Sequence, residues 1–393
     1  MKNGNQTGNG GGASPEQANM MARNLVLTKS IDMWQSIYQQ TLSGDPRGDV
    51  INIPIRNVGL IKRLVVEISF NVVQAAAETL TRTAFGISNV LSNITFTDLS
   101  NQTRVNTTGW HMHALATARR QMAFGAAFTN DSPVDIGSNY AVISQPSPVT
   151  TVQTCRMFYE IPLAYGDFDL RGAVYANVVN ATMNLQLTVN PNIIVGSAGN
   201  PTQAAYISST AGDVGTISAF TVKVYQNYLD QLPMGDKGPI LPIMDLSTAY
   251  LINNTVATGM SAGQDFAIPY ANFRNFMSTF VVYDNFGSAT AVGAEINNWS
   301  IQSANYTNII QVDPLMSSLL TRQIINDDFP AEAARTSYYF DHRRKPINTV
   351  QFGNMQLIAN PSQVQASTSQ FLVGYEALAL INMITQAGSL YNT

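Results

Sequence analysis

Two closely spaced histidines are the residues most suggestive of a metal site. His111 and His113 are separated by one residue, and on a β-strand such side chains share one face, where they could bind a metal ion. The surrounding residues indicate a helix instead, on which positions two apart diverge by about 200°. Ala114 to Gln121 contain no carboxylate, and His342 is the only other histidine. We therefore predict packed or hydrogen-bonded histidines, with no metal and no cofactor.

A serine between two glycines is the strongest candidate for a nucleophile. Gly259–Gly263 matches the nucleophile-elbow pattern around Ser261, and Asp284 or Asp313 followed by His342 would complete the chain order of a Ser-Asp-His triad. An elbow needs a hydrophobic strand before it and a helix after it, whereas polar residues flank this one. We expect a turn between strands and assign no catalytic residue.

Neighbouring carboxylates could serve a glycosidase, because that chemistry uses two acidic side chains on either side of the scissile bond. Glu160, Asp167 and Asp169 are close together in the sequence. We expect them to be carboxylates that form turns and cap helices rather than a catalytic pair.

The basic residues do not form a surface suited to nucleic acid. The chain has 21 Lys and Arg against 25 Asp and Glu, whereas binding to phosphates needs a basic face. The short run His342–Lys345 is the only basic cluster. We interpret it as a subunit contact or a solvated loop and predict no direct binding of nucleic acid.

The composition indicates a surface that can be buried against other subunits. Charged residues are 12% of the 393, against about 25% in typical soluble domains, and uncharged polar residues take their place. Such a surface is easily covered by neighbouring subunits, although a neutral, secreted all-β protein would have the same composition. The single Cys155 cannot form an intrachain disulfide and is expected to be buried.

The N-terminal segment predicts a flexible tail followed by a helix. Residues 1–13 are rich in Gly and Asn. Ser14 can cap the helix, Pro15 suits its first position and Gln17 can reach back to the cap. We expect the helix to run from about Pro15 to Gln40. Its apolar stripe would contain Met20, Leu27, Ile31, Trp34 and Tyr38.

This helix has two possible environments. It could lie on a bilayer, with Trp34 in the apolar stripe and with Arg23 and Lys29 near anionic headgroups. The stripe could equally dock beneath the protein's own sheets. Arg23, Lys29 and Trp34 are therefore the candidate membrane-facing residues. No apolar run approaches the roughly 18 residues needed to span a bilayer.

A period of two dominates the rest of the chain. Apolar residues from Leu64 to Val72 alternate with polar ones, and Met183 to Val189 repeats the pattern, which predicts half-buried antiparallel strands. Further strands are expected at Ile51–Ile55, Cys155–Ile161, Ala219–Tyr225, Phe280–Tyr283, Thr349–Phe352, Met355–Ile358 and Phe371–Tyr375. Many short strands with polar connections indicate an all-β sandwich or barrel.

Two inserted helices suggest an internal duplication. One is expected around Trp110–Met122, and the other opens at Asp313–Pro314. A similar polar turn follows each, at Asn130–Pro133 and at Asn326–Pro330. Between the copies, the proline-rich segment Leu232–Pro242 excludes a continuous helix or a paired central strand.

We therefore place a domain boundary near residues 240–246. The predicted parts are a tail and helix over 1–48, a first β-sandwich over 49–242, and a second β-sandwich with the C-terminal segment over 243–393.

Several motifs in one order resemble the major capsid proteins of tectiviruses, the tail-less phages with a membrane beneath the protein shell. The resemblance covers about residue 50 to the C-terminus. The matching segments are Thr108–His113, Ile161–Tyr165, Asp169–Val174, Tyr228–Gly235, Ile240–Pro242, Asp245–Thr248, Asp328–Pro330, Lys345–Ile347 and Gln351–Asn354.

The resemblance implies two fused eight-stranded jelly rolls, three chains in a trimer, and trimers that tile an icosahedral shell over an inner membrane. Six similar barrels from three chains make a nearly hexagonal tile, and such tiles pack without gaps. The N-terminal helix would lie on the inner side. The implied partners are further copies of the chain, and penton, minor capsid and membrane proteins of the virion. The protein would be assembled in the host bacterial cytoplasm.

The alternative hypothesis is a soluble double-sandwich carbohydrate-active enzyme or lectin. A stable monomer at low concentration would favour this alternative, whereas a persistent trimer without activity on glycans would favour the capsid.

Overall fold

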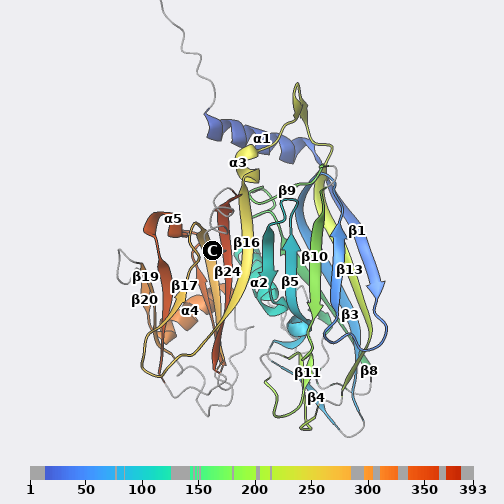
Figure 1. Ribbon diagram of the computed structural model, residues 1–393, viewed down its shortest axis with the longest axis vertical. Coiled ribbons are helices and arrows are strands. Elements are labelled where there is room, and N and C mark those ends of the chain that lie inside the picture. Colours follow the sequence, from blue (N-terminus) through green and yellow to red (C-terminus); the bar gives the residue numbers. More distant parts are fainter. Residues whose placement is uncertain are drawn as a thin grey trace, which may run out of the picture.

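Two β-sandwiches stand side by side, and one helix lies across their shared end. Figure 1 shows this arrangement. The computed structural model describes residues 14–75, 78–83, 85–124, 142–144, 147, 149, 152–178, 181–200, 204–212, 215–284, 296–303, 310–325, 335–362 and 369–381. The polar turns expected at 130–133 and 326–330 lie outside these residues.

The first sandwich is built from two antiparallel sheets. One has the order β1 (Ile31–Thr41), β13 (Thr216–Asp230), β3 (Leu60–Val73), β8 (Val152–Pro162) and β7 (Val142–Ser144). The facing strands are β2 (Val50–Ile55), β10 (Met183–Val189), β5 (Leu91–Thr97) and β6 (Thr103–Thr107). Helix α2 (Gly109–Phe124) follows β6, as predicted for Trp110–Met122.

The second sandwich repeats this order, except that no described strand corresponds to β7. One sheet is β16 (Thr248–Thr258), β24 (Gln370–Leu380), β18 (Asn275–Asp284) and β21 (Arg335–Asp341). It faces β17 (Phe266–Pro269), β23 (Met355–Pro361), β19 (Ile296–Ser303) and β20 (Ile310–Val312). Helix α4 (Pro314–Ile325) follows β20, just as α2 follows β6. The equivalent pairs include β1 with β16, β6 with β20, and α2 with α4. The prediction of two fused eight-stranded jelly rolls is confirmed.

Short elements fill the ends of the sandwiches. They are α3 (Ile243–Leu246), α5 (Thr349–Phe352), the 3-10 helix Gly86–Val90, β4 (Leu80–Arg82), β9 (Val174–Tyr175), β11 (Ile194–Val195), β12 (Tyr206–Ser208), β14 (Met234–Gly235), β15 (Gly238–Pro239) and β22 (Ile347–Asn348). The strand expected at Thr349–Phe352 is wrong. The Asn348 side chain accepts hydrogen bonds from the Val350 and Gln351 amides and so starts the helical turn α5 instead.

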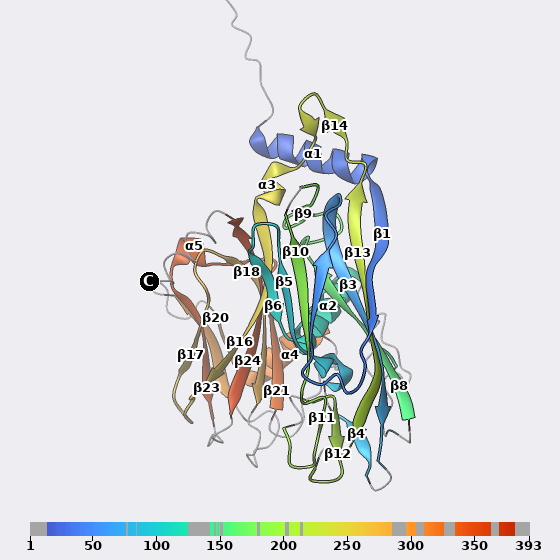
Figure 2. The same cartoon turned by 45° about the vertical axis from the view of Figure 1, so that its right-hand side comes forward.

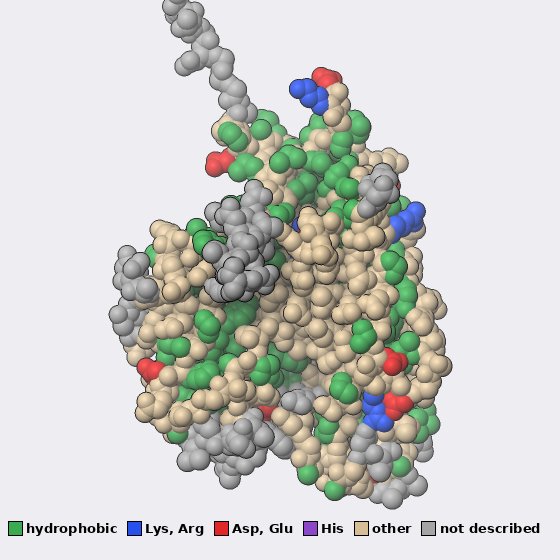
Figure 3. Space-filling model, viewed as in Figure 1, with side chains coloured by type: hydrophobic (Ala, Val, Ile, Leu, Met, Phe, Trp, Pro, Cys, Tyr) green, Lys and Arg blue, Asp and Glu red, His purple; other side chains and the backbone are tan. Residues whose placement is uncertain are grey.

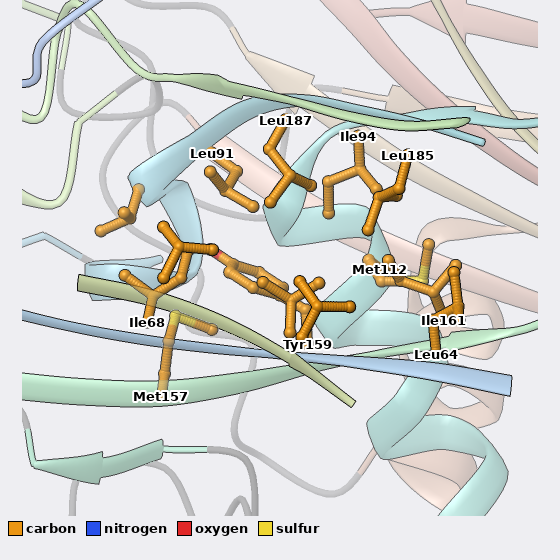
Figure 4. Close-up of a cluster of buried hydrophobic side chains, with 14 of the residues drawn as sticks. Leu64, Ile68, Leu91, Ile94, Met112, Met157, Tyr159, Ile161, Leu185 and Leu187 are labelled. Atoms are coloured by element: carbon orange, nitrogen blue, oxygen red, sulfur yellow. The ribbon is translucent and has the colours of Figure 1, made fainter. Parts of the chain in front are cut away.

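Alternating side chains produce the core of the first sandwich. Leu185 and Leu187 of β10 point down from one sheet, and Leu64 and Ile68 of β3 point up from the other, with Tyr159 between them (Figure 4). All five are buried, with no more than 1% of any of them exposed. Each buried side chain of this size stabilises the fold by about 1.5–3 kcal/mol.

The core of the second sandwich is richer in aromatic residues. Trp299 is completely buried, and its ring lies edge-on to Tyr338, Phe340 and Phe371 at centroid distances of 5.0, 5.7 and 5.7 Å. Each sandwich thus has its own core, as the predicted duplication requires.

The N-terminal helix is shorter than the sequence indicated. Ser14 and Gln17 form the predicted capping box, but α1 spans only Pro15–Lys29, and Ser30 is extended. The chain then enters β1, which pairs with β13 from Ile31↔Asp230 onward. The expectation of a helix as far as Gln40 is therefore wrong, because the cross-strand ladder outweighs the accidental three- and four-residue spacing. Trp34 lies on this strand, which belongs to the first sandwich even though it precedes residue 49.

Candidate functional site

The two histidines of the candidate metal motif lie on α2 and are buried. Nδ1 of His111 is 2.6 Å from Oγ1 of Thr107, so this histidine is packed and hydrogen-bonded. Among the described residues, no group of three or more His, Cys, Asp and Glu side chains is placed to hold a metal ion.

The candidate nucleophile Ser261 lies in an exposed turn between β16 and β17. Gly259 and Gly263 have φ values of 85° and 70°, which glycine adopts without the strain that other residues would suffer. His342, the proposed base of the triad, is 5% exposed. The turn between strands that the sequence indicated is what the structure contains.

Each of the neighbouring carboxylates is paired with an arginine. Glu160 lies 2.7 Å from Arg63, which also contacts Asp167. Asp169 binds Arg171 at 2.6 Å and accepts a hydrogen bond from its backbone amide. Asp169 thus fits the predicted turn role, whereas Glu160 and Asp167 form ion pairs.

The junction between the sandwiches combines a strand ladder, an apolar cluster and a buried ion pair. Strands β6 and β16 pair in parallel through Ile252↔Val105 and Asn253↔Asn106. This ladder merges one sheet from each sandwich into a single nine-stranded sheet.

Helix α2 fills the space beside this ladder. Its Trp110 packs on Phe85, at 5.8 Å, and on Phe280 of β18, at 5.4 Å. The apolar cluster also contains Ala114, Ala118, Val282 and Tyr339. The outer face of the second sandwich is thereby covered by a helix of the first.

A buried carboxylate organises the polar part of the junction. Glu376 of β24 is completely buried. It accepts hydrogen bonds from Tyr250 at 2.8 Å, Ser278 at 2.7 Å and Arg343 at 3.0 Å. Burial opposes its ionisation, but Arg343 and Arg119, together with these hydrogen bonds, outweigh burial and hold the pKa of Glu376 below its ordinary value.

Arg343 does not have the role that the sequence suggested. Its side chain is only 12% exposed and binds Glu376, so this residue of the basic run is neither solvated nor available to another subunit. It stabilises the interior of the chain.

A cavity of about 410 Å³ with both polar and apolar lining adjoins this network. Its lining includes Lys62, Arg63, Leu115, Arg119, Tyr165 and Arg343. Arg119 of α2 donates a hydrogen bond to the Tyr165 carbonyl and lies over the ring of Tyr250 at 5.3 Å. The cavity is thus the place where side chains of both sandwiches meet.

Replacing Gly374 with alanine should loosen the junction. An added Cβ would lie 2.1 Å from the His111 ring, so either β24 or α2 must shift. We expect a loss of about 1–3 kcal/mol, measured as a lower urea midpoint. Gly212→Ala is the matched control, because nothing lies within 4 Å of its added Cβ. Equal midpoints for the two variants would contradict the packing described here.

Helix α1 is fixed to the body by an ion pair, an apolar contact and two hydrogen bonds of Asn19, one to the Asp245 carboxylate and one from the Met244 amide. The Arg23 guanidinium donates hydrogen bonds to both carboxylate oxygens of Asp245 in α3, at 2.5 and 2.6 Å, and Asp245 is 2% exposed. Val26 is completely buried beside Leu60 and Leu229. One side of the helix thus docks on the protein, and the Arg23 charge has a partner within the chain.

Removing the Arg23 charge should release the helix without unfolding the sandwiches. We expect Arg23→Met to speed amide hydrogen exchange in α1 at least tenfold, because Asp245 would be left buried without its cation. Lys29→Met is the control, since Lys29 is exposed. Unchanged exchange in Arg23→Met would show that Val26 and the hydrogen bonds of Asn19 hold the helix without the ion pair.

Exposed apolar side chains gather at the end of the molecule where α1 lies. Met20 and Met21 of α1 are 52% and 65% exposed, and Ile243 and Met244 of α3 are 66% and 46% exposed. Hairpin β14–β15 projects from the same end (Figure 2), and its Met234 is 71% exposed. Charged side chains are few and scattered on the face shown in Figure 3. No described helix has the length and hydropathy needed to cross a membrane.

The sequence reasoning missed Glu376, Arg119 and Asp245. A sequence signal existed for Glu376, because a single carboxylate interrupts the apolar run from Phe371 to Leu380. Such a residue in a predicted buried strand calls for a cationic partner. No comparable sequence pattern marked Arg119 or Asp245 as a residue of a buried ion pair.

Family models match most of the chain. One described as "P3 major capsid protein N-terminal" matches residues 14–232, and one described as "P3 major capsid protein C-terminal" matches residues 247–391. Major capsid protein P3 of Enterobacteria phage PRD1 is 36% identical over 381 residues, which is 96% of this chain and 94% of that protein.

Solved structures share the fold. The STIV MCP crystal structure has a TM-score of 0.58 at 12% identity, over 87% of this chain and 96% of that one. The PBCV-1 virus capsid has a TM-score of 0.51 at 11% identity, over 90% and 96%. The chain is a structural component of the virion capsid rather than an enzyme, and it belongs to the tectivirus-type P3 major capsid protein family.

Proposed function

We propose that three copies of this chain form a pseudo-hexagonal capsomer and that such trimers tile an icosahedral shell over an internal membrane. One observation carries the proposal: each chain presents two topologically equivalent sandwiches side by side. Three chains then supply six similar sandwiches, and a closed ring of six has the hexagonal outline that covers a surface without gaps.

Within this proposal each chain has two domains with a boundary near residues 240–246. Penton, minor capsid and membrane proteins of the virion would be further partners, and assembly would take place in the host bacterial cytoplasm. Contacts between trimers would be weaker than those within them, because a shell closes correctly only if misplaced trimers can detach.

Light scattering at low protein concentration tests the trimer. We expect a mass three times 42.7 kDa that persists on dilution, since contacts within the trimer are proposed to be permanent. A stable monomer would contradict the proposed function.

The exposed apolar side chains at the end of the molecule where α1 lies support the proposed contact with the internal membrane. Met20, Met21, Ile243, Met244 and Met234 would face the lipid, with the exposed Lys29 and Trp34 nearby. Methionine and isoleucine side chains bury favourably in the outer acyl region, and an uncompensated lysine favours anionic headgroups. Arg23 contributes by holding α1 in place, because its charge is paired with Asp245.

Vesicle flotation tests this contact. Trimers should float with vesicles that contain anionic phosphatidylglycerol, and Met20→Ser/Met21→Ser/Met244→Ser should reduce the bound fraction at least threefold. Val256→Ser is the control, because Val256 is 53% exposed but lies on β16 rather than at this end. Equal flotation of the triple variant and the wild type would exclude these side chains from lipid contact.

A further inference from the structure

The cavity of about 410 Å³ at the junction is large enough to hold a small molecule, because small-ligand sites occupy about 300–1,000 Å³. The charged side chains that line it are Lys62, Arg63, Arg119, Glu160, Asp167 and Arg343. Met112, Leu115 and Ala116 of α2 contribute buried apolar groups to the same lining. The cavity therefore offers both a charged and an apolar side to a ligand.

Three of the four cations in this lining already have a carboxylate partner in the chain. The pairs are Lys62 with Asp32 at 2.9 Å, Arg63 with Glu160 at 2.7 Å, and Arg343 with Glu376 at 3.0 Å. Arg63 also contacts Asp167, whose side chain is 56% exposed and is therefore well hydrated. The charges of these three cations are thus compensated, and none of them requires a further anion.

Arg119, the fourth cation, has no carboxylate partner within ion-pair distance among the described residues. Its guanidinium donates one hydrogen bond, to the Tyr165 carbonyl, and lies over the rings of Tyr165 and Tyr250 at 5.9 and 5.3 Å. The Glu376 carboxylate is bound by Arg343 instead. Contacts with aromatic rings compensate a cation only weakly, and a guanidinium has five N–H donors. Arg119 therefore retains both charge and donors for an anion.

The surroundings of Arg119 favour an anion with a single charge and an apolar part. A carboxylate matches the fork of one guanidinium and brings one negative charge. A phosphate monoester brings nearly two, and the carboxylates of Glu160 and Asp167 in the same lining would repel the second. A short hydrocarbon chain would be buried against Met112 and Leu115 of α2.

We infer that this cavity binds a small organic carboxylate with a short apolar chain. The carboxylate pairs with Arg119, and the apolar chain lies against α2. Because α2 belongs to the first sandwich and Arg343 to the second, a ligand in this cavity contacts both and stabilises the junction by mass action. The site lies within one chain and does not depend on the proposed trimer.

Saturation-transfer NMR of hexanoate with the purified full-length protein tests the site. We expect a dissociation constant of about 1 mM, as is usual for a ligand of this size held by one ion pair. Hexanol, which has no charge, and hexyl phosphate, which has nearly two, should bind roughly tenfold more weakly or worse. No binding of hexanoate up to about 20 mM would overturn the site. Hexyl phosphate binding as tightly as hexanoate would overturn the choice of a carboxylate.

Two variants locate the bound hexanoate. Arg119→Met should weaken binding roughly tenfold or more, because the ion pair is lost. Arg47→Met is the matched control, since Arg47 pairs with Asp45 outside the cavity, and it should bind hexanoate as the wild type does. Ala116→Leu keeps every charge but fills the cavity beside Arg119, and it should weaken binding to a similar degree. If Arg119→Met does not fold, Ala116→Leu decides. Wild-type affinity in either folded cavity variant would overturn the inference.

Discussion

Replacing Glu376 with alanine is expected to lower the free energy of unfolding by about 3–5 kcal/mol, the usual cost of removing one partner from a buried ion pair. Arg343 and Arg119 would remain in the junction without the carboxylate between them, and Tyr250 and Ser278 would lose their acceptor. Because these groups come from both sandwiches, the junction should open first. Urea denaturation at fixed protein concentration measures the loss, with hydrogen exchange of α2 reporting the opening.

Two further variants separate this effect from a general loss of charge. Asp45→Ala removes an exposed carboxylate, 40% accessible, that pairs with Arg47 at 2.6 Å, and it should cost no more than about 1 kcal/mol. Glu376→Leu/Arg343→Met should recover part of the stability lost in Glu376→Ala, since apolar replacements of a buried pair are often nearly neutral. A loss below about 1 kcal/mol in Glu376→Ala would contradict the role of the network.

Acidification from pH 7 to pH 5.5 is expected to destabilise the protein through its histidines. Burial lowers the pKa of His111, His113 and His342 to about 4, against 6.5 in the unfolded chain. Their stabilising contribution is present above pH 6.5 and is lost as the pH falls toward 4, because the unfolded chain takes up protons that the folded chain refuses. At pH 5.5 the expected loss is roughly 1 kcal/mol for each histidine.

The slope of stability against pH provides the measurement. Urea midpoints between pH 7.5 and 5.5 should fall steadily, and His342→Gln should reduce the slope by about one third, since one of three groups no longer titrates. Carboxylates remain largely ionised in this range. A stability independent of pH over this range would show that the three histidines are not held neutral.

The sequence was sufficient to predict the positions of the main strands and the duplication of the sandwich. Alternation from Leu64 to Val72 and from Met183 to Val189 predicts strands that the structure contains, because a strand with one buried face needs apolar residues at every second position. The segment after Lys29 was misread for a related reason. Ile31, Trp34 and Tyr38 fit a helical stripe by spacing, and only pairing with β13, nearly two hundred residues later, makes the segment a strand.

The junction could not be predicted from the sequence. Glu376 meets Ser278 and Tyr250, which are 98 and 126 residues away along the chain, and local pattern carries no information on such contacts. The equivalence of α2 and α4 was visible in outline, because Trp110 and Asp313–Pro314 both marked inserted helices. Trp110 of α2 is buried, whereas Leu315 of α4 is 80% exposed, and this difference follows only from placing the two sandwiches side by side.

Electron cryomicroscopy of the purified oligomer, at a resolution that traces strands, tests the central claim most directly. The account predicts a threefold ring of six sandwiches, in which each of three chains contributes the two sandwiches that β6 and β16 join. A twofold dimer, or separate chains that form no ring, would contradict it.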